Sequence, residues 1–225
     1  EISEVNIGFN RMAQKLAQVE QDRTVMLAGI SHDLRTPLAR LRLETEMSVA
    51  DADARDHMVA DIAQLDATID KFLDYARPDR VSLEPMLLNE VLDSCVYAGK
   101  HYGDRELHMS ITEQLMVMAD EVELSRVVSN LLENARRYAR SEDTNMAVVD
   151  ISAKAWDDWV MVKIRDHGAG VPPELLPELT KPFFRGDAAR SAAAGAGLGL
   201  AIVDKTVQRM GGIFALANTS SSGLA

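Results

Sequence analysis

The sequence predicts an α+β protein in which an N-terminal helical hairpin precedes a mixed sheet covered on one face by helices. Two changes of pattern indicate this. Residues 1–76 place apolar side chains at helical spacing, whereas from about residue 82 alternating segments are mixed with amphipathic ones. Strands and helices do not alternate strictly there, which disfavours an all-parallel sheet. Pro78 and Asp79 begin the linker between the two parts.

The first helix carries a heptad seam. Its apolar residues are spaced alternately three and four apart, as in coiled coils and bundles, and they are Ile2, Val5, Phe9, Met12, Leu16 and Val19. Arg23 takes the next seam position. Met26, Ile30 and Leu34 then follow in steps of four, a stutter that locally relaxes supercoiling.

A second helix is expected after the acidic turn at residues 51–54. Its apolar stripe has the same period and consists of Met58, Ile62, Leu65, Ile69 and Phe72. Two such helices have too little core to be stable alone. Two hairpins from two chains would form a four-helix bundle, so we expect a homodimer.

Residues 30–38 contain the most informative side chain of the chain. Ile30 and Leu34 lie about 200° around the helix from His32, which should therefore face water. Thr36, one turn later, shares the face of His32. An exposed imidazole beside the Asp33 carboxylate is equipped to act as a nucleophile, although a lone His-Asp pair is more often an ordinary surface feature.

Pro37 follows within the same helix. Its ring crowds the carbonyl of Asp33 and it cannot donate a hydrogen bond there. We expect a bend at this point, acting as a hinge beside His32.

The second part is predicted to contain three helices and four strands. The helices are expected at 87–102, 122–139 and 198–210, the last one ending at Gly211 and Gly212. The strands are expected at 107–111, 147–155, 159–166 and 213–217, with a tight turn joining the second to the third.

Composition and charge limit the classes of partner and the cellular setting that we expect. The net charge of −11 argues against a nucleic-acid partner. Apolar runs are far shorter than the roughly 18 residues that cross a bilayer, and no signal peptide is visible. The sequence does not begin with methionine, which suggests a fragment of a longer protein. Cys95 is the single cysteine, so we expect a reducing, cytosolic setting and neither a disulfide framework nor a thiolate metal cluster.

Three clusters in the second part carry polar chemistry. Asn130 and Asn134 lie four apart on one helical face, and their amide oxygens suit a hydrated Mg²⁺. Arg137, one turn beyond Asn134, can reach a phosphate. Asp166 follows a predicted strand and can accept from an exocyclic amino group, with Gly168 and Gly170 allowing close backbone approach. Each cluster alone could be a solvated face or a plain turn.

The third cluster is the glycine-rich segment at 195–200. It opens a predicted helix, whose N-terminus presents free N–H groups to phosphate. It is neither a Walker loop nor a Rossmann turn. The small residues at 188–194 before it are expected to form a mobile lid. We expect one of Phe183 and Phe184 to pack and the other to move with that lid.

Taken in order, these clusters resemble the five motifs of bacterial sensor histidine kinases of the EnvZ type. The match covers nearly the whole chain, and five motifs in this order and spacing are very specific. The resemblance implies that residues 1–22 end a HAMP-like linker, residues 23–77 form the dimerisation and phosphotransfer hairpin, and residues 82–225 form an α/β sandwich ATP-binding domain.

The resemblance also implies residue roles. His32 would attack the γ-phosphate of ATP, Asp33 would orient it, and Thr36 would position water for dephosphorylation of the partner. Asn134 would bind Mg²⁺ and Asp166 the adenine amino group. Further nucleotide contacts would come from Asn130, Arg137, Tyr138, Gly168, Gly170, Phe184, Arg185, Gly195, Gly197, Leu198 and Gly199.

The implied partners are a second copy of the chain and the receiver domain of a response regulator. The resemblance places the chain in the cytoplasmic portion of a bacterial inner-membrane protein, joined to the membrane through a preceding segment. Ala196 stands where the family often has a hydroxyl residue, and the sequence stops at Ala225 where the family continues into a closing strand. These departures bear on nucleotide affinity and domain stability. An ATPase of the same nucleotide-binding architecture and a non-catalytic signalling scaffold are the alternatives.

Overall fold

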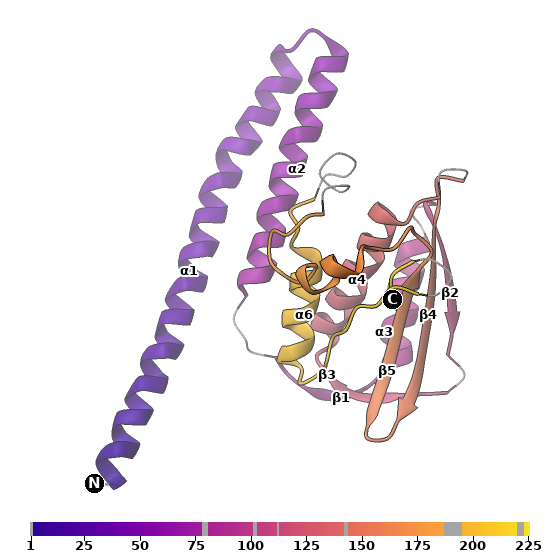
Figure 1. Ribbon diagram of the computed structural model, residues 1–225. Coiled ribbons are helices and arrows are strands. Elements are labelled where there is room, and N and C mark those ends of the chain that lie inside the picture. Colours follow the sequence, from indigo (N-terminus) through magenta and orange to yellow (C-terminus); the bar gives the residue numbers. More distant parts are fainter. Residues whose placement is uncertain are drawn as a thin grey trace. The chain divides into compact units, whose positions relative to one another are not determined.

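The computed structural model describes residues 2–77, 81–100, 103–111, 113–141, 144–186, 195–219 and 223–225. The chain divides into two compact units, residues 1–79 and residues 80–225 (Figure 1). Among the described residues, no helix combines the length and the apolar character that a bilayer crossing requires.

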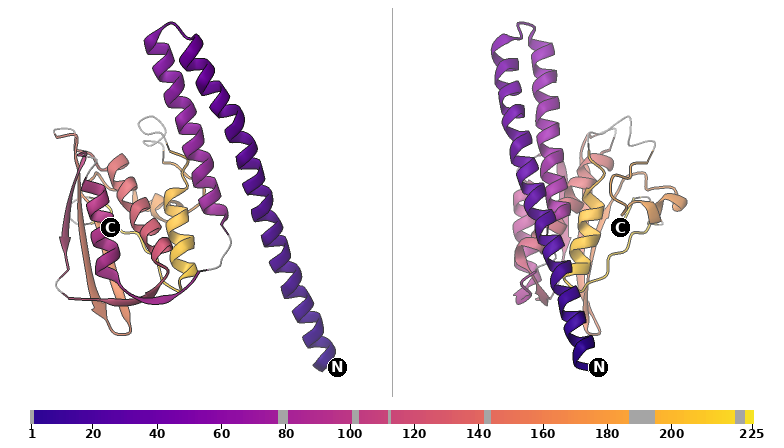
Figure 2. Two further views of the ribbon diagram at one scale, coloured as in Figure 1. Left: turned by 180° about the vertical axis from the view of Figure 1, so that it is seen from behind. Right: turned by 90° about the vertical axis from the view of Figure 1, so that its left-hand side faces the viewer.

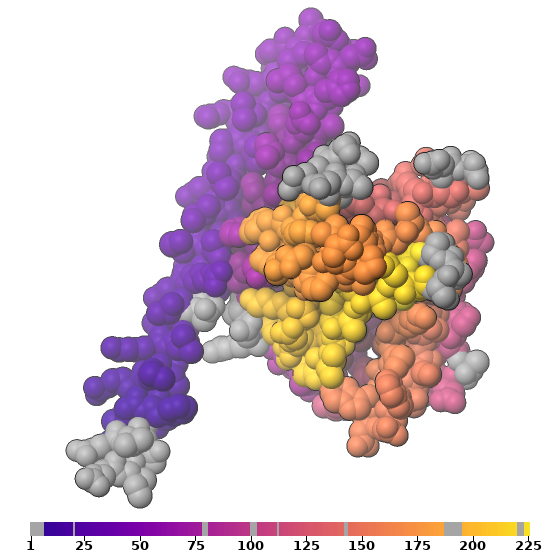
Figure 3. Space-filling view, viewed as in Figure 1, coloured from indigo at the N-terminus to yellow at the C-terminus, as the bar shows by residue number. Residues whose placement is uncertain are grey.

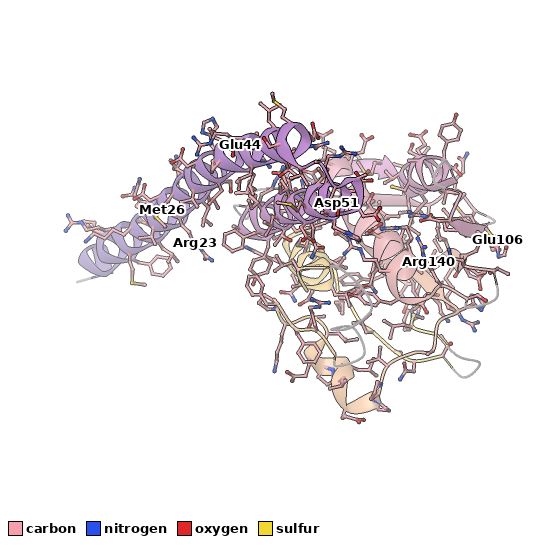
Figure 4. The ribbon with its side chains drawn as sticks, turned by 90° about the horizontal axis from the view of Figure 1, so that it is seen from above. Arg23, Met26, Glu44, Asp51, Glu106 and Arg140 are labelled. Atoms are coloured by element: carbon pink, nitrogen blue, oxygen red, sulfur yellow. The ribbon has the colours of Figure 1, made fainter. Side chains whose placement is uncertain are left out.

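The first unit is a hairpin of two long helices. Helix α1 spans Ile2–Ser48 and α2 spans Ala52–Ala76, and they run antiparallel and side by side (Figure 2). Asp51, at the turn in Figure 4, caps α2 by accepting hydrogen bonds from the N–H groups of Asp53 and Ala54 at 3.0 and 3.2 Å. The expected hairpin is confirmed. Pro37 lies inside α1, which remains helical on both sides of it, and the bend there stays a prediction.

The hairpin buries few side chains. Ser31 and Thr45 are buried, but none of the 25 residues of α2 is. Ile30 and Leu34 of the predicted stripe remain 44% and 46% exposed in the single chain. Two helices can cover only one side of each other, so most of the apolar seam stays in contact with water.

The second unit contains two small sheets. Strands β1 (Glu84–Leu87) and β3 (Met116–Ala119) form an antiparallel pair. In the other sheet, β4 (Ala147–Trp156) lies between β2 (Arg105–Ser110), which is parallel to it, and β5 (Trp159–Asp166), which is antiparallel. The predicted mixed sheet and β4–β5 hairpin are confirmed.

Helices cover one face of this sheet (Figure 1). They are α3 (Leu88–Lys100) and α4 (Glu121–Tyr138), with α6 (Gly199–Arg209) packed against α4. A short 3-10 helix spans Pro173–Glu178. Alternate residues of β2 and β4 point toward the helices, and the shared core contains Leu88, Leu92, Leu107, Val128, Leu132, Val149 and Ile151. The fold class is therefore the predicted one.

Three strands differ from expectation. Strands β1 and β3 were not anticipated. The strand predicted at 213–217 is not formed, and only its last residue pairs, through Ala217 and Ala225 at 2.8 and 2.9 Å. A strand needs a hydrogen-bonded neighbour, and a groove separates most of this segment from β5. Ile213 is consequently exposed.

Candidate functional site

The imidazole of His32 projects into solvent. Its side chain is 83% exposed, and Nδ1 lies 3.4 Å from Oδ1 of Asp33, which is exposed as well. Thr36 donates a long hydrogen bond of 3.4 Å from Oγ1 to the carbonyl oxygen of His32, one turn earlier. The prediction that these three side chains share an exposed turn is confirmed, and the other ring nitrogen is open to an incoming electrophile.

The rotation of this turn is set by its neighbours. Ser31 is buried, whereas Arg35 reaches across to α2, where it pairs with Asp66 at 3.3 Å and with Asp70. A small buried residue on one side and a cross-helix ion pair on the other orient His32 outward. Sequence reasoning did not identify this pair, although Arg35 and the two aspartates, spaced four apart, fit a charged interhelical edge.

In the second unit, Asn134 and Asp166 line the same groove, which measures about 1270 Å³. Its walls are largely apolar and include Leu131, Ile164 and Leu200. The C-terminal segment (yellow in Figure 3) and the β4–β5 hairpin (salmon) border it. An apolar groove with few polar groups is typical of a small-molecule site.

Asn130 does not lie on a solvated face, which was the alternative interpretation of its cluster. It is only 5% exposed, and its side-chain amide donates to the carbonyl oxygen of Arg126 at 2.9 Å. Its Oδ1 lies 3.9 Å from the position that a Cβ of Gly199 would occupy. Asn130 and Asn134 remain four residues apart on α4, but Asn130 is buried because α6 packs against this part of α4.

The C-terminal turn of α4 meets the glycine-rich segment. A Cβ at Gly195 would lie 2.7 Å from Nη1 of Arg137 and 3.6 Å from the hydroxyl oxygen of Tyr138. The structure thus brings Arg137, Tyr138 and Gly195 together, as the resemblance implied. A side chain at this position would displace the guanidinium.

Glu133 was missed by sequence reasoning. It accepts hydrogen bonds from Nε of Arg137 at 2.7 Å and from Arg136 at 2.6 and 2.7 Å. Burial alone would raise the pKa of Glu133, but the hydrogen bonds from Arg136 and Arg137 outweigh it and lower the pKa to about 2. Glu133 is therefore ionised at neutral pH and orients Arg137 beside the glycines.

The loop after β5 is held tightly. Oδ1 of Asp166 accepts from the N–H groups of Gly168 and Leu224, both at 3.0 Å. A Cβ on Gly168 would lie 2.9 Å from Cβ of Ala139, and Gly170 has a φ of 74°. Both glycines are needed for this loop, which holds Asp166 at the groove.

The segment before α6 is joined to the two phenylalanines. The N–H of Phe183 donates to the carbonyl oxygen of Gly197 at 2.9 Å, and both residues have positive φ. Phe183 is 59% exposed and Phe184 is half-buried, in line with the expectation that one packs. The expected lid, residues 188–194, lies outside the described residues.

The remaining predicted residues are partly buried. Arg185 and Gly199 are half-buried, and Leu198 is fully buried as the residue before α6. Leu198 is 1% exposed as a whole residue, and its predicted nucleotide contact stays a prediction. Among the described residues, no cluster of three or more histidine, cysteine or acidic side chains has the geometry of a metal site. A magnesium site that uses the amide oxygen of Asn134 is of a different kind, because asparagine is not one of those side chains.

Comparison with known families assigns both units. Residues 22–80 match the family model described as His Kinase A (phospho-acceptor) domain. Residues 119–224 match the one described as histidine kinase-, DNA gyrase B- and HSP90-like ATPase. The first match contains His32, and the second contains Asn134, Asp166 and the glycine-rich segment.

Curated relatives agree with these assignments. Sensor protein RstB of Escherichia coli (strain K12) is 34% identical over 92% of this chain and 48% of its own length. The histidine-protein kinase/phosphatase MprB of Mycolicibacterium paratuberculosis is 29% identical over 99% of the chain and 45% of its own length. The chain spans about half the length of the curated relatives it matches.

A solved structure shares the architecture. The crystal structure of full-length ShkA in complex with AMPPNP superposes with a TM-score of 0.70 at 25% identity, covering 90% of this chain and 44% of that one. The structure of the mycobacterial sensor histidine kinase MprB has a TM-score of 0.55 at 29% identity, covering 63% of this chain and 93% of that one.

Proposed function

We propose that this chain, which belongs to the sensor histidine kinase family, transfers the γ-phosphoryl group of ATP to His32 and then to an aspartate of a receiver domain. The observation that carries the proposal is the exposed imidazole of His32 with its Nδ1 facing the Asp33 carboxylate at 3.4 Å. That contact supports the tautomer with the proton on Nδ1, which leaves the lone pair of Nε2 for attack.

The phosphoryl transfer requires no oxidant or reductant. Nε2 of His32 forms the bond to the γ-phosphorus, and the bond from that phosphorus to the oxygen of the departing ADP breaks. Asp33 stabilises the positive charge that develops on the ring. Phosphoryl transfer depends mainly on positioning and charge neutralisation, so the chain must bring nucleotide and histidine together rather than supply covalent chemistry of its own.

The proposed nucleotide site extends from Asn134 and Asp166, which line the groove of the second unit, to Arg137 and the glycines of the glycine-rich segment, which lie outside its lining. Asp166 would accept a hydrogen bond from the adenine amino group. The backbone N–H groups of Gly168 and Leu224, which donate to Oδ1, hold its carboxylate in place for this role. Arg137 and the backbone of the glycine-rich segment would meet the phosphates. The amide oxygen of Asn134 would bind Mg²⁺, an ion that prefers one or two protein oxygens together with phosphate oxygens. Bound Mg²⁺ would neutralise phosphate charge.

The partners follow from the first unit. The half-exposed stripe of Ile30, Leu34 and Leu41 supports a homodimer in which a second hairpin covers it. A receiver domain would approach the exposed turn of His32. We further propose that residues 1–22 end a HAMP-like linker and that a preceding segment joins the chain to the inner membrane, with the described part in the cytoplasm.

Labelling with ATP and Mg²⁺ tests the kinase. His32→Ala should abolish phosphorylation of the chain, because its nucleophile is gone, while His57→Ala, an exposed histidine of α2, should be labelled like the wild type. Asn134→Ala should reduce labelling by weakening metal-dependent nucleotide binding. The product should be lost in acid and survive alkali, as a phosphoramidate does. Undiminished labelling of His32→Ala would overturn the proposal.

A phosphatase activity toward the phosphorylated receiver domain is proposed for Thr36. Its hydroxyl lies one turn from His32 on the exposed face, where it could orient a water molecule. Thr36→Ala should spare autophosphorylation and slow dephosphorylation of the receiver domain, while Thr36→Ser retains both. Equal loss of the two activities in Thr36→Ala would contradict this division of roles.

A further inference from the structure

A chain of four polar side chains crosses the exposed face of the three-stranded sheet and ends at the loop that holds Asp166. His108 of β2 lies in register with Asp150 of β4, so both point to one face. Nδ1 of His108 is 3.2 Å from Oδ1 of Asp150, and its Nε2 is 3.0 Å from Glu106. Oδ2 of Asp150 is 2.7 Å from Nε2 of His167. Figure 4 shows Glu106 at the edge of the unit.

Both ring nitrogens of His108 face carboxylate oxygens. A protonated imidazole donates from both nitrogens, whereas a neutral one donates from only one and sets a lone pair against the other carboxylate. The hydrogen bond to Glu106 and then the one to Asp150 raise the pKa of His108. The hydrogen bond from His167 lowers the pKa of Asp150; burial opposes this shift, and the bond from His108 adds to it. The four-membered chain is therefore complete when His108 is protonated and Asp150 is not.

Other charged side chains lie on this face. Arg165 of β5 is the register partner of Asp150, and Lys163 is the partner of Ser152 two residues along. Among the described residues of these three strands and the following loop, His108 and His167 are the histidines on this face.

The last member of the chain controls a short, constrained loop. His167 follows Asp166 directly, and Gly168 packs against Ala139 at the end of α4 so closely that a Cβ would lie 2.9 Å from that of Ala139. The loop is thus held by α4 on one side and by Asp150 through His167 on the other. Releasing His167 would loosen the peptide unit that positions Asp166.

We infer that Asp150 is a positioning residue for nucleotide binding, holding the Asp166 loop through His167 and tightening that hold when His108 is protonated. This inference rests on the proposed function, in which Asp166 receives the adenine amino group. Single exposed ion pairs contribute little, but a connected network contributes more. Nucleotide affinity should therefore be about threefold higher on the acid side of neutrality than at alkaline pH.

The test is calorimetric titration of the whole chain with a non-hydrolysable ATP analogue and Mg²⁺, at intervals from about pH 6 to about pH 8.5, a range that spans histidine titration. His108→Gln should bind about threefold more weakly than the wild type at the acid end and equally well at the alkaline end. Asp150→Asn also loses the hold on His167, so it should bind more weakly than the wild type throughout and show no dependence on His108 protonation. Ser152→Ala, on the same face of β4, is the control and should follow the wild type. Titration of the phosphates is common to all variants and cancels in the comparison.

Two outcomes would overturn the inference. If Asp150→Asn weakens binding by one factor at every pH, the carboxylate has only a structural role. If the profiles of Asp150→Asn and His108→Gln match the wild type, the network does not reach the nucleotide. Both differ from failure of the proposed function, which would appear as a wild-type chain that binds no nucleotide at any pH. Because His108 is about half exposed, His108→Gln should fold normally.

Discussion

The two units of the chain differ in where their apolar side chains lie. The α/β unit encloses a core in which Leu92, Ile151 and Ile202 are almost completely removed from water. The hairpin leaves Ile30 and Leu34 nearly half exposed and buries nothing in α2. A sheet with helices across one face can surround a side chain, whereas two helices cannot. The unit with the groove is thus self-contained, and the unit with His32 depends on further packing.

The largest expected effect comes from truncating a core residue. Ile151→Ala should lower the free energy of unfolding of the α/β unit by about 3 kcal/mol, because it removes a fully buried side chain and leaves a cavity. Leu34→Ala should lower the free energy of unfolding of the hairpin by less than this in dilute solution. Its effect should increase at high protein concentration, where the proposed dimer would bury Leu34. Urea denaturation at two protein concentrations would measure both.

The concentration dependence of Leu34→Ala also tests the proposed dimer. If Leu34→Ala destabilises the hairpin equally at both concentrations, the hairpin is stabilised within one chain, and the dimer proposal loses its support. Leu43→Ala is a suitable control on α1, because that side chain is also exposed but lies outside the predicted stripe.

Helix caps offer a smaller, matched contrast. Asp120 accepts from the N–H groups of Val122 and Glu123 at the start of α4 and also from the N–H of Ser82 at 3.0 Å. Asp51 serves as a cap, accepting from the N–H groups of Asp53 and Ala54 at the start of α2. Asp120→Ala should therefore cost about 2 kcal/mol and Asp51→Ala about 1 kcal/mol.

Thermal unfolding followed by circular dichroism would rank the two cap variants. Asp51→Asn should recover most of the loss, since asparagine also caps helices. Asp120→Asn should recover only the capping part, because its single amide oxygen cannot also accept from the N–H of Ser82. A larger loss for Asp51→Ala would show that the bond to Ser82 contributes nothing.

The smallest expected difference between the two units is in the stability that each loses at acidic pH. The pKa of Glu133 is lowered in the folded chain to about 2, so its stabilising effect is present above its ordinary pKa and is lost as pH falls toward the lowered one. The α/β unit should lose stability over this range, and Glu133→Gln should lose less. The hairpin should respond weakly, because its Arg35–Asp66 pair is about half exposed. Urea midpoints measured at several acidic pH values would check this; equal slopes for Glu133→Gln and wild type would contradict it.

Elements with local signals could be predicted from the sequence. The seam of α1, the Asp51 turn and the β4–β5 hairpin each depend on residues close together in the chain. The segment 213–217 has a strand-like sequence but is not one, because strand formation depends on a neighbour that may lie anywhere in the sequence. Strands β1 and β3 were missed for the same reason, since they pair with each other from about 30 residues apart.

The candidate site divides in the same way. The exposed turn of His32, Asp33 and Thr36 was determined by the sequence itself, because helical hydrogen bonds fix the relation of residues within one turn. Only the tertiary structure decided that Asn130 is buried against α6, that Glu133 holds Arg137, and that Asp150 meets two histidines. Those relations arise from packing between distant segments, and no local spacing encodes which polar groups packing will remove from water.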